Sequence, residues 1–396
     1  MTANTKREEG ISMARPLDTG RRPKVVVCGT RWGRVYLQAF LEPSFPFELV
    51  GIVGQGSDRS KACAEFYDVP LYTDVQQVPD DVDIACVVIS AGVQGGRGAE
   101  IAQAFMDRGI HVLQEHALHH DELAACLRAA RRNGVQYRLN THYPHIEPVR
   151  RFVAAARELF TKQRPQFIDA TCAIQVAYTL FDVLGRALGG ARPWGFADIP
   201  TIPDELRALT ELEFPYRSAN GVFAGVPMTL RMQNQMKSSD PDNYTHLFHR
   251  ITVGTDGGHL TLVNTQGPVL WSPRPHGPEE AWHTVRLFDT DAAHLTYPSA
   301  TVLGPAAGPD YREIVGSVWP GGVRTALGAL RRAAIAGDDP LKEGQYYLTL
   351  CRLWQDLTTR LGYPTQLTRS DAPDVLPADD LEKAALAVGP KDGWHE

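Results

Sequence analysis

Residues 24–34 (KVVVCGTRWGR) constrain the fold of this chain more than any other stretch. Three β-branched residues, Val25 to Val27, predict a strand that is covered on both faces. A glycine turn follows, and apolar residues then return at helical spacing. A strand, a glycine turn and a helix in this order can hold a phosphate, because helix N–H groups and the helix dipole favour negative charge. The candidate cofactor-binding residues of this turn are Gly29, Thr30, Arg31, Trp32 and Gly33.

The glycine pattern of this turn is not the full dinucleotide fingerprint G-x-G-x-x-G. Counting from Gly29, Arg31 stands where the second glycine should be and Arg34 stands where the third should be. The turn alone is equally compatible with an ordinary strand-to-helix connection. The units that follow therefore decide between the two interpretations.

The second unit bears on the choice of cofactor. Residues 47–53 (FELVGIV) predict a second buried strand, and a helix is expected over residues 61–67. In an NAD-preferring site an acidic residue near the end of this strand binds the ribose hydroxyls, but here that position falls on Gly54 and Gln55. Two hydroxyls and a guanidinium suit a 2′-phosphate, so we predict NADPH/NADP+ over NAD, bound by Ser57, Arg59 and Ser60. The alternative is a serine-capped helix with a solvated arginine.

Strands and helices continue to alternate up to about residue 143. Strands are predicted at 84–89, 111–115 and 135–139, with helices at 99–108 and 121–133. This order predicts an α/β fold with a doubly wound parallel sheet, in which ligands bind at the carboxyl ends of the strands. Residues at these ends complete the candidate cofactor site: Ser90, Ala91 and Glu115.

The length of 396 residues predicts two domains. We expect a disordered tail at 1–22, a Rossmann domain at 23–143, and an α+β domain for substrate binding and dimerisation at 144–396. In the second domain strands are expected at 166–174, 226–236, 246–253, 258–263 and 268–271, mostly antiparallel in a large mixed sheet. Helices are expected at 146–160, 175–188, 321–336, 344–361 and 380–388.

Composition excludes several classes of function. The net charge of −6 and the lack of a basic run beyond the first 24 residues argue against nucleic-acid binding. No apolar run approaches the roughly 20 residues of a membrane span, and the N-terminus lacks the apolar region of a signal peptide. The six cysteines are scattered without a C-x-x-C pair, so we expect free thiols, a cytoplasmic location and no zinc site.

The order of these pieces resembles the Gfo/Idh/MocA oxidoreductase superfamily. Two departures separate the chain from its sugar dehydrogenases: Glu115-His116-Ala117 replaces Glu-Lys-Pro, and Asp182-x-x-x-Arg186 replaces Asp-x-x-x-His. Four segments closely resemble the thiazolinyl imine reductases of siderophore biosynthesis, namely GTRWGRVYLQAF, GQGSDRSKACAEFYDVPLYTD, QEHALHHDEL and NTHYPH.

This resemblance implies a reaction and its partners. NADPH would reduce a thiazoline C=N bond to a thiazolidine while the intermediate stays tethered to a carrier protein of a nonribosomal peptide synthetase. The resemblance also implies a homodimer formed through the open sheet. It makes His116 and Tyr143 the candidate catalytic residues that donate a proton, and it makes residues 57–60 the 2′-phosphate site.

The chemistry of the residues leaves the choice of proton donor open. A free tyrosine has a pKa of about 10, so Tyr143 would need a cationic neighbour, whereas histidine, at about 6.5, is partly protonated near neutral pH. His116 could donate directly while Tyr143 holds the substrate, and His142 is a further candidate helper. Hydride transfer needs no metal, so no metal site is expected. The alternative functions are a sugar or cyclitol NADP-dependent dehydrogenase and a non-catalytic NADP(H)-binding regulator.

Overall fold

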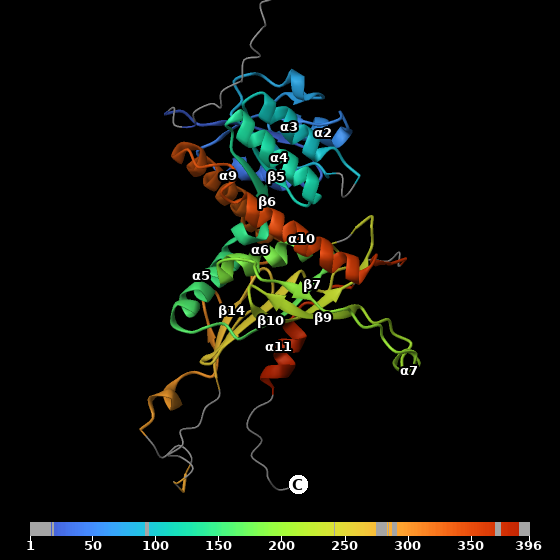
Figure 1. The fold of residues 1–396 in the computed structure, drawn as a ribbon, viewed down its shortest axis with the longest axis vertical. Coiled ribbons are helices and arrows are strands. Elements are labelled where there is room, and N and C mark those ends of the chain that lie inside the picture. The colour runs from blue at the N-terminus through green and yellow to red at the C-terminus, as the bar shows by residue number, and fades with distance from the viewer. Residues whose placement is uncertain are drawn as a thin grey trace, which may run out of the picture.

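The computed structural model shows two sheets stacked end to end along the long axis of the molecule (Figure 1). It describes residue 17 and residues 20–91, 95–240, 242–274, 283, 285–286, 291–368 and 374–387. The predicted disordered tail at 1–22 lies almost wholly outside the described residues. The domain boundaries at 143 and 144 stay a prediction.

The first sheet is the predicted doubly wound sheet. Its six strands are all parallel and lie in the order β3-β2-β1-β4-β5-β6. Their bounds are β1 Lys24–Cys28, β2 Glu48–Val53, β3 Leu71–Tyr72, β4 Ile84–Val87, β5 His111–Glu115 and β6 Tyr137–Asn140. The strand order reverses between β1 and β4, which is where such folds bind dinucleotides.

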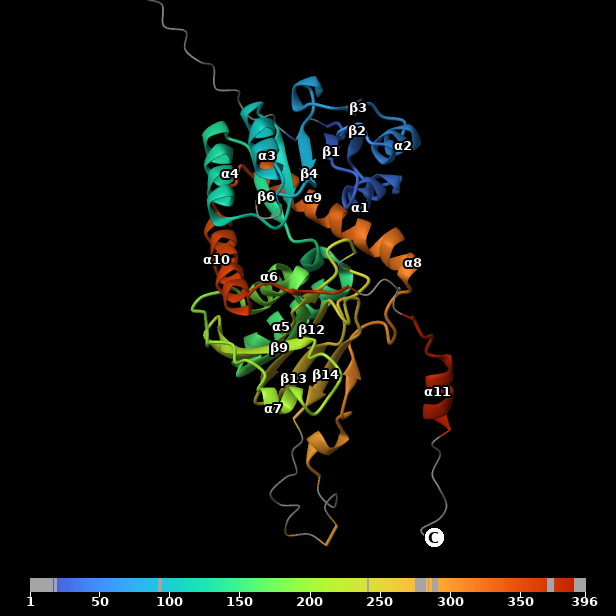
Figure 2. The same cartoon turned by 90° about the vertical axis from the view of Figure 1, so that its right-hand side faces the viewer.

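Helices cover both faces of this sheet, and one of them comes from the far end of the chain. The helices within this half are α1 Gly33–Gln38, α2 Asp58–Phe66, α3 Gly98–Asp107 and α4 His120–Asn133. Helix α9 (Trp319–Ala336) returns to the first sheet (Figure 2). Its buried Val323, Leu327 and Leu330 share an apolar core with Val25 and Val27 of β1. The sequence half assigned to the substrate domain thus also supports the sheet that is predicted to bind the cofactor.

The second sheet has eight strands in the order β15-β14-β13-β12-β7-β10-β9-β8. Strands β7 and β10 pair in parallel and the other neighbours pair antiparallel, so the predicted mixed, mostly antiparallel sheet is confirmed. The bounds are β7 Phe167–Ala173, β8 Gly195–Phe196, β9 Tyr216–Phe223, β10 Val226–Gln233, β12 His249–Thr255, β13 Gly258–Leu262, β14 Val269–Pro273 and β15 Thr301–Val302. A two-stranded parallel sheet joins β11 Gln235–Met236 to β16 Thr365–Gln366.

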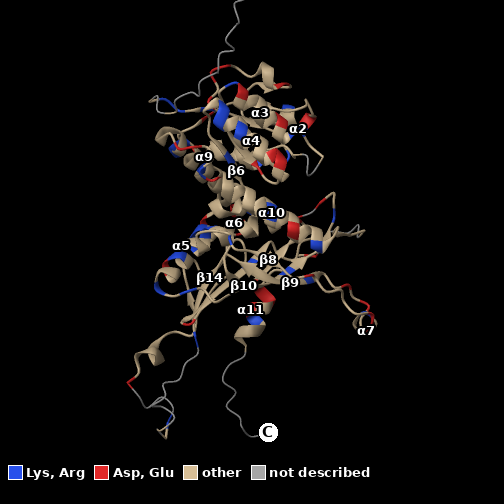
Figure 3. Cartoon of the chain, in the orientation of Figure 1, with Lys and Arg blue, Asp and Glu red and all other residues tan. Residues whose placement is uncertain are grey.

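The remaining helices are α5 Glu147–Lys162, α6 Ala177–Leu188, α7 Asp204–Arg207, α8 Tyr311–Glu313, α10 Gly344–Leu361 and α11 Asp379–Leu386. Helices α5 and α6 lie between the two sheets, and α10 links the two halves (Figures 1 and 2). Acidic and basic residues are interspersed along the helices and strands of both halves (Figure 3). None of the helices in the described residues has the length and apolar character needed to cross a membrane. All six cysteines are free, as expected.

Candidate active site

The glycine turn after β1 is tightly packed against the neighbouring strands. Gly29 has φ +93° and its N–H donates to the Val53 carbonyl at 2.8 Å. A Cβ atom at this position would lie 2.5 Å from the Val88 carbonyl oxygen, so only glycine fits. Because no side chain projects from Gly29, a dinucleotide can approach the backbone closely at the switch point of the sheet.

Of the three residues that were predicted to bind a 2′-phosphate, two are exposed and one is buried. Ser57 caps α2, and its Oγ accepts from the Ser60 N–H at 3.3 Å. Ser60 is buried, and its hydroxyl donates to the Ser57 carbonyl at 2.7 Å. Ser57 and Arg59 are exposed, and within the described part of the chain the Arg59 side chain has no hydrogen-bond or ion-pair partner. Ser60 thus stabilises the cap, while Ser57 and Arg59 are free to reach a ligand.

A cavity of about 210 Å³ lies where the carboxyl ends of the first sheet meet the second half of the chain. It brings together five predicted site residues: Trp32, Ser90, Glu115, His116 and Tyr143. The other lining residues are Val88, Ile89, His142, Gln175, Val176 and Asp242. Residues from the glycine turn, from the ends of β4, β5 and β6, and from the second half of the chain therefore form one site.

Glu115 and His116 form a paired acid and base in this cavity. His116 Nδ1 lies 2.8 Å from Glu115 Oε1, and the two side chains are 15% and 12% exposed. The other Glu115 oxygen accepts from the Tyr36 hydroxyl, which in turn accepts from the Asn140 amide. Burial and the charge on Glu115 raise the pKa of Tyr36 well above its usual value, so Tyr36 stays protonated. The Glu115 carboxylate is thereby held between the Tyr36 hydroxyl and the His116 ring.

Tyr143 lines the same cavity and is buried among aromatic rings. It is 5% exposed and packs edge-on against His249, with ring centroids 5.2 Å apart. Burial raises the pKa of Tyr143, and the negative charges of Asp242 and Glu115 raise it further. Its hydroxyl can therefore donate a hydrogen bond, but it resists losing its proton at neutral pH.

His142 is buried beside Tyr143 and is neutral. Its ring lies 5.5 Å from Trp32 and 6.2 Å from Trp319, centroid to centroid. Burial lowers its pKa to about 4, and neither ring nitrogen has a hydrogen-bond partner among the described residues. A neutral imidazole cannot supply the positive charge that was expected next to Tyr143.

Two family models match the chain. Residues 23–141 match the GFO_IDH_MocA model, described as an oxidoreductase family with an NAD-binding Rossmann fold. Residues 163–272 match the model described as thiazolinyl imine reductase Irp3-like, C-terminal. The chain is a Gfo/Idh/MocA oxidoreductase with an Irp3-like C-terminal domain. This confirms the predicted superfamily and the enzyme class, an NAD(P)-dependent oxidoreductase.

Several solved structures are similar to this chain in fold. A putative NADPH-dependent oxidoreductase from Desulfitobacterium hafniense has a TM-score of 0.61 at 12% identity, covering 86% of this chain and 96% of its own. A 3-ketoreductase from Actinomadura kijaniata, in complex with TDP-benzene and NADP, gives 0.59 at 17%, covering 88% and 100%. An oxidoreductase from Agrobacterium radiobacter, in complex with NAD+, L-tartaric acid and magnesium, gives 0.60 at 10%, covering 84% and 94%. At these identities the likeness shows the fold alone. No curated protein matches the chain in sequence.

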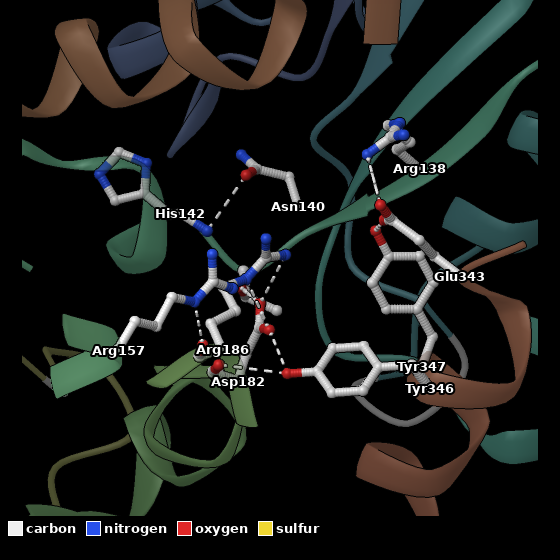
Figure 4. A network of polar contacts seen from close by, with 10 residues as sticks. Arg138, Asn140, His142, Arg157, Asp182, Arg186, Glu343, Tyr346 and Tyr347 are labelled. Atoms are coloured by element: carbon white, nitrogen blue, oxygen red, sulfur yellow. Dashed lines mark hydrogen bonds and ion pairs between the residues drawn. The ribbon is translucent and has the colours of Figure 1, made fainter. Parts of the chain in front are cut away.

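In this Gfo/Idh/MocA oxidoreductase the Asp182–Arg186 pair lies in a structural network (Figure 4). Asp182 is fully buried and accepts from Arg186 Nε at 2.8 Å, from the Tyr346 hydroxyl at 2.7 Å and from the Thr141 hydroxyl. Burial disfavours its charge, but Arg186 and these hydrogen bonds outweigh that effect and hold the pKa of Asp182 below its usual value. The network joins the end of β6 to α6 and α10, and Asp182 is not among the residues that line the cavity.

Sequence reasoning missed four residues in or around this candidate site: Tyr36, Asn140, Gln175 and Asp242. Asn140 ends β6, and its place at a carboxyl strand end was a usable signal. Tyr36 lies on α1 and donates a hydrogen bond to Glu115. The two residues are 79 positions apart in sequence, so local sequence does not predict this contact. Gln175 and Asp242 come from the second half of the chain, where no motif or residue spacing predicted a place in the cavity.

Proposed function

We propose that this protein uses NADPH to reduce the thiazoline C=N bond of a siderophore intermediate to a thiazolidine. The intermediate is tethered to a carrier protein of a nonribosomal peptide synthetase. The observation that carries the proposal is the Glu115–His116 pair, held at 2.8 Å in a cavity beside the glycine turn. The match of residues 163–272 to thiazolinyl imine reductases supports the choice of substrate.

Reduction of C=N adds a hydride to carbon and a proton to nitrogen. Bound NADPH supplies the hydride. His116 donates the proton from Nε2, because Nδ1 already faces the Glu115 carboxylate. Glu115 stabilises the charged imidazole before it gives up the proton, and Tyr36 fixes the orientation of Glu115. A positioned acid of this kind accelerates a reaction by about 10²–10⁴-fold.

Tyr143 takes a holding role in this proposal. Its raised pKa makes it a poor proton donor, but its hydroxyl is a good hydrogen-bond donor to a polar atom of the substrate. The neutral ring of His142 packs behind it and keeps water away from the cavity wall.

The residues around the switch point fit an NADP cofactor. Gly29 lets the backbone approach the pyrophosphate closely. The loop after β2 carries no carboxylate at Gly54 or Gln55, while Ser57 and Arg59 are exposed at the start of α2. These two side chains would hold the 2′-phosphate, so NADPH is the proposed cofactor in preference to NADH.

The test compares two variants on a synthetic thiazoline thioester with NADPH. His116→Asn should lower kcat by at least about 10²-fold, since the acid is lost. Tyr143→Phe should mainly raise KM and should leave kcat within about threefold. Neither change should alter the NADPH dissociation constant. The reverse pattern would transfer the proton-donating role to Tyr143, and full activity in both variants would reject this mechanism.

We also propose a homodimer formed through the face of the second sheet that α5 and α6 leave uncovered, and a cytoplasmic location. Sedimentation analysis would test the dimer. A strict monomer at micromolar concentration would reject it.

A further inference from the structure

The backbone at His142, the residue before Tyr143, has a conformation that residues other than glycine rarely adopt. Its φ is +60° and its ψ is −67°. The Tyr143 N–H donates to the Thr141 carbonyl at 2.8 Å, so these three residues form a γ-turn of the rare, strained kind. Strain of this kind persists only where the surrounding structure holds the residue in place. The contacts around His142 must therefore stabilise the turn.

Hydrogen bonds fix the backbone on both sides of His142. Its N–H donates to the side-chain oxygen of Asn140 at 3.1 Å (Figure 4), and the Asn140 amide donates to the Tyr36 hydroxyl. The Thr141 hydroxyl donates to Asp182, which is fully buried. The turn is thus tied to the residues that support the proposed acid, and also to the network that joins β6, α6 and α10.

Two tryptophan rings and the backbone of α9 enclose the His142 side chain, which is 1% exposed. The ring centroid of Trp32 lies 5.5 Å away and that of Trp319 lies 6.2 Å away, while the two tryptophans are 5.1 Å apart. A Cβ atom at Gly322 of α9 would lie only 3.4 Å from His142 Cε1. Both ring nitrogens of His142 are buried and without a hydrogen-bond partner in the described part of the chain, so they offer no polar contact to a substrate.

The turn at His142 determines where the Tyr143 side chain lies. Tyr143 lines the cavity beside the glycine turn, and its ring centroid is 5.3 Å from that of His142 and 5.2 Å from that of His249. A change of φ or ψ at His142 would turn the Tyr143 Cα–Cβ bond, so the direction of the hydroxyl depends on the strained turn. Trp319 does not line the cavity and would affect Tyr143 through the His142 ring.

We propose that His142 is a positioning residue: its strained turn, enclosed by Trp32 and Trp319, directs the Tyr143 hydroxyl toward the substrate. This inference rests on the proposed function, in which Tyr143 holds the thiazoline. It makes two statements that are tested separately. The His142 ring fixes the position of the Tyr143 side chain, and that position determines how tightly the thiazoline is bound.

Crystal structures of two variants test the first statement. His142→Ala removes the enclosed ring, so residue 142 should leave the positive-φ region, the γ-turn hydrogen bond should be lost and the Tyr143 hydroxyl should turn away from the cavity. His142→Phe keeps a ring in the same place, so Tyr143 should stay where it is in the wild type. The same Tyr143 position in the wild type and in His142→Ala would overturn the proposal.

A second pair of variants covers the case in which His142→Ala does not fold. Trp319→Leu opens the enclosure from α9 without changing a residue of the cavity wall, and it should displace Tyr143 in the same way. Trp194→Leu is the matched control, because Trp194 is also a half-buried tryptophan and lies before β8. It should leave Tyr143 in place. An unmoved Tyr143 in Trp319→Leu would contradict the enclosing role of Trp319.

A double-mutant cycle tests the second statement. Calorimetry measures binding of a thiazoline methyl thioester to the protein saturated with NADP+, which cannot supply a hydride. His142→Ala and Tyr143→Phe should each weaken binding by about tenfold, because each removes the same hydrogen bond. The double variant should also be weakened only about tenfold, and His142→Phe should bind like the wild type. A loss of about 100-fold in the double variant would mean that the two residues act independently and would overturn the proposal.

The outcomes for this proposal and for the proposed function are distinguishable. A wild type that binds the thioester and does not reduce it with NADPH would reject the proposed reaction, while the cycle would still show the positioning role. Reduction of the thioester by His142→Ala with an unchanged KM would reject the positioning role and leave the reaction standing. If the wild type does not bind the thioester, the proposed substrate is rejected, and the Tyr143 position in the crystal structures decides the positioning role.

Discussion

His116 Nδ1 lies 2.8 Å from Glu115 Oε1, at the carboxyl end of β5 and in the wall of the cavity beside the glycine turn. Adjacent residues of one strand end therefore form a hydrogen-bonded acid and base. Tyr36, on the helix that follows the glycine turn, holds the other carboxylate oxygen. The helix that begins at the proposed cofactor turn thus also supports the residues that are proposed to deliver the proton.

The charge on Glu115 should matter for turnover. Glu115→Gln keeps the shape of the side chain but removes a charge-assisted hydrogen bond that is worth about 1.5–3 kcal/mol, so kcat should fall by about 10- to 100-fold. NADPH affinity should stay within about threefold. Steady-state kinetics and a fluorescence titration measure both, with Glu100→Gln at an exposed glutamate as the control. An unchanged kcat would show that Glu115 has no part in proton delivery.

The exposed guanidinium of Arg59 should select the cofactor. Arg59→Ala should weaken NADPH binding by about 10- to 100-fold, because a hydrogen bond between charged groups is lost. NADH has no 2′-phosphate, so its binding should change little. Titration of both cofactors against Arg59→Ala and against Arg128→Ala, an exposed arginine on α4, makes the comparison. Equal loss for NADPH and NADH would remove the 2′-phosphate assignment.

Asp182 should contribute to stability and not to catalysis. Asp182→Asn leaves Arg186 in a largely buried place without its counter-charge, and breaking a buried pair in this way costs about 3–5 kcal/mol. The urea midpoint should fall, while kcat of the folded protein stays within about threefold. Asp198→Asn, in an exposed pair with Arg360, should change neither. A large loss of kcat at unchanged stability would restore the sugar dehydrogenase alternative.

Buried neutral histidines should make the fold sensitive to acid. Burial lowers the pKa of His142 to about 4 and of His249 to about 4, against about 6.5 when unfolded. Between these values the unfolded chain binds more protons, so the free energy of unfolding falls as the pH drops from 6.5 toward 4. At pH 5 the share of His142 alone is about 2 kcal/mol.

The change His142→Phe isolates this contribution. The variant should lose about 2 kcal/mol less than the wild type between pH 7.5 and pH 5 in urea unfolding, whereas His246→Phe, at an exposed histidine, should behave like the wild type. If His142→Phe and the wild type lose the same free energy over this range, His142 is not held neutral by burial.

The first sheet was predictable because the local sequence of each strand and turn favours the structure that it adopts in the fold. Val25 to Val27 are β-branched and Gly29 ends their strand, so local sequence and tertiary fold agree there. Polar residues at the strand ends, such as Glu115 and His116, followed from topology, since parallel strands bring their carboxyl ends to one edge. Both residues line the cavity at this edge, and their roles there stay a prediction.

Other features depend on tertiary contacts that local sequence does not encode. Strand β9 (Tyr216–Phe223) was not predicted, because its alternation is weak and Asn220-Gly221 resembles a turn. The predicted strand at 226–236 is divided into β10 and the short β11. The buried cap role of Ser60 and the carboxylates near Tyr143 also emerged only from packing.

The most direct test of the proposed reaction follows the hydride itself. The protein is mixed with NADPH deuterated at C4 and a thiazoline thioester, and the product is analysed by mass spectrometry and NMR. The proposed function predicts NADPH consumption that depends on the thiazoline, and a thiazolidine with one deuterium at the former imine carbon. NADPH that binds without being consumed, or a product without deuterium, would contradict the central claim.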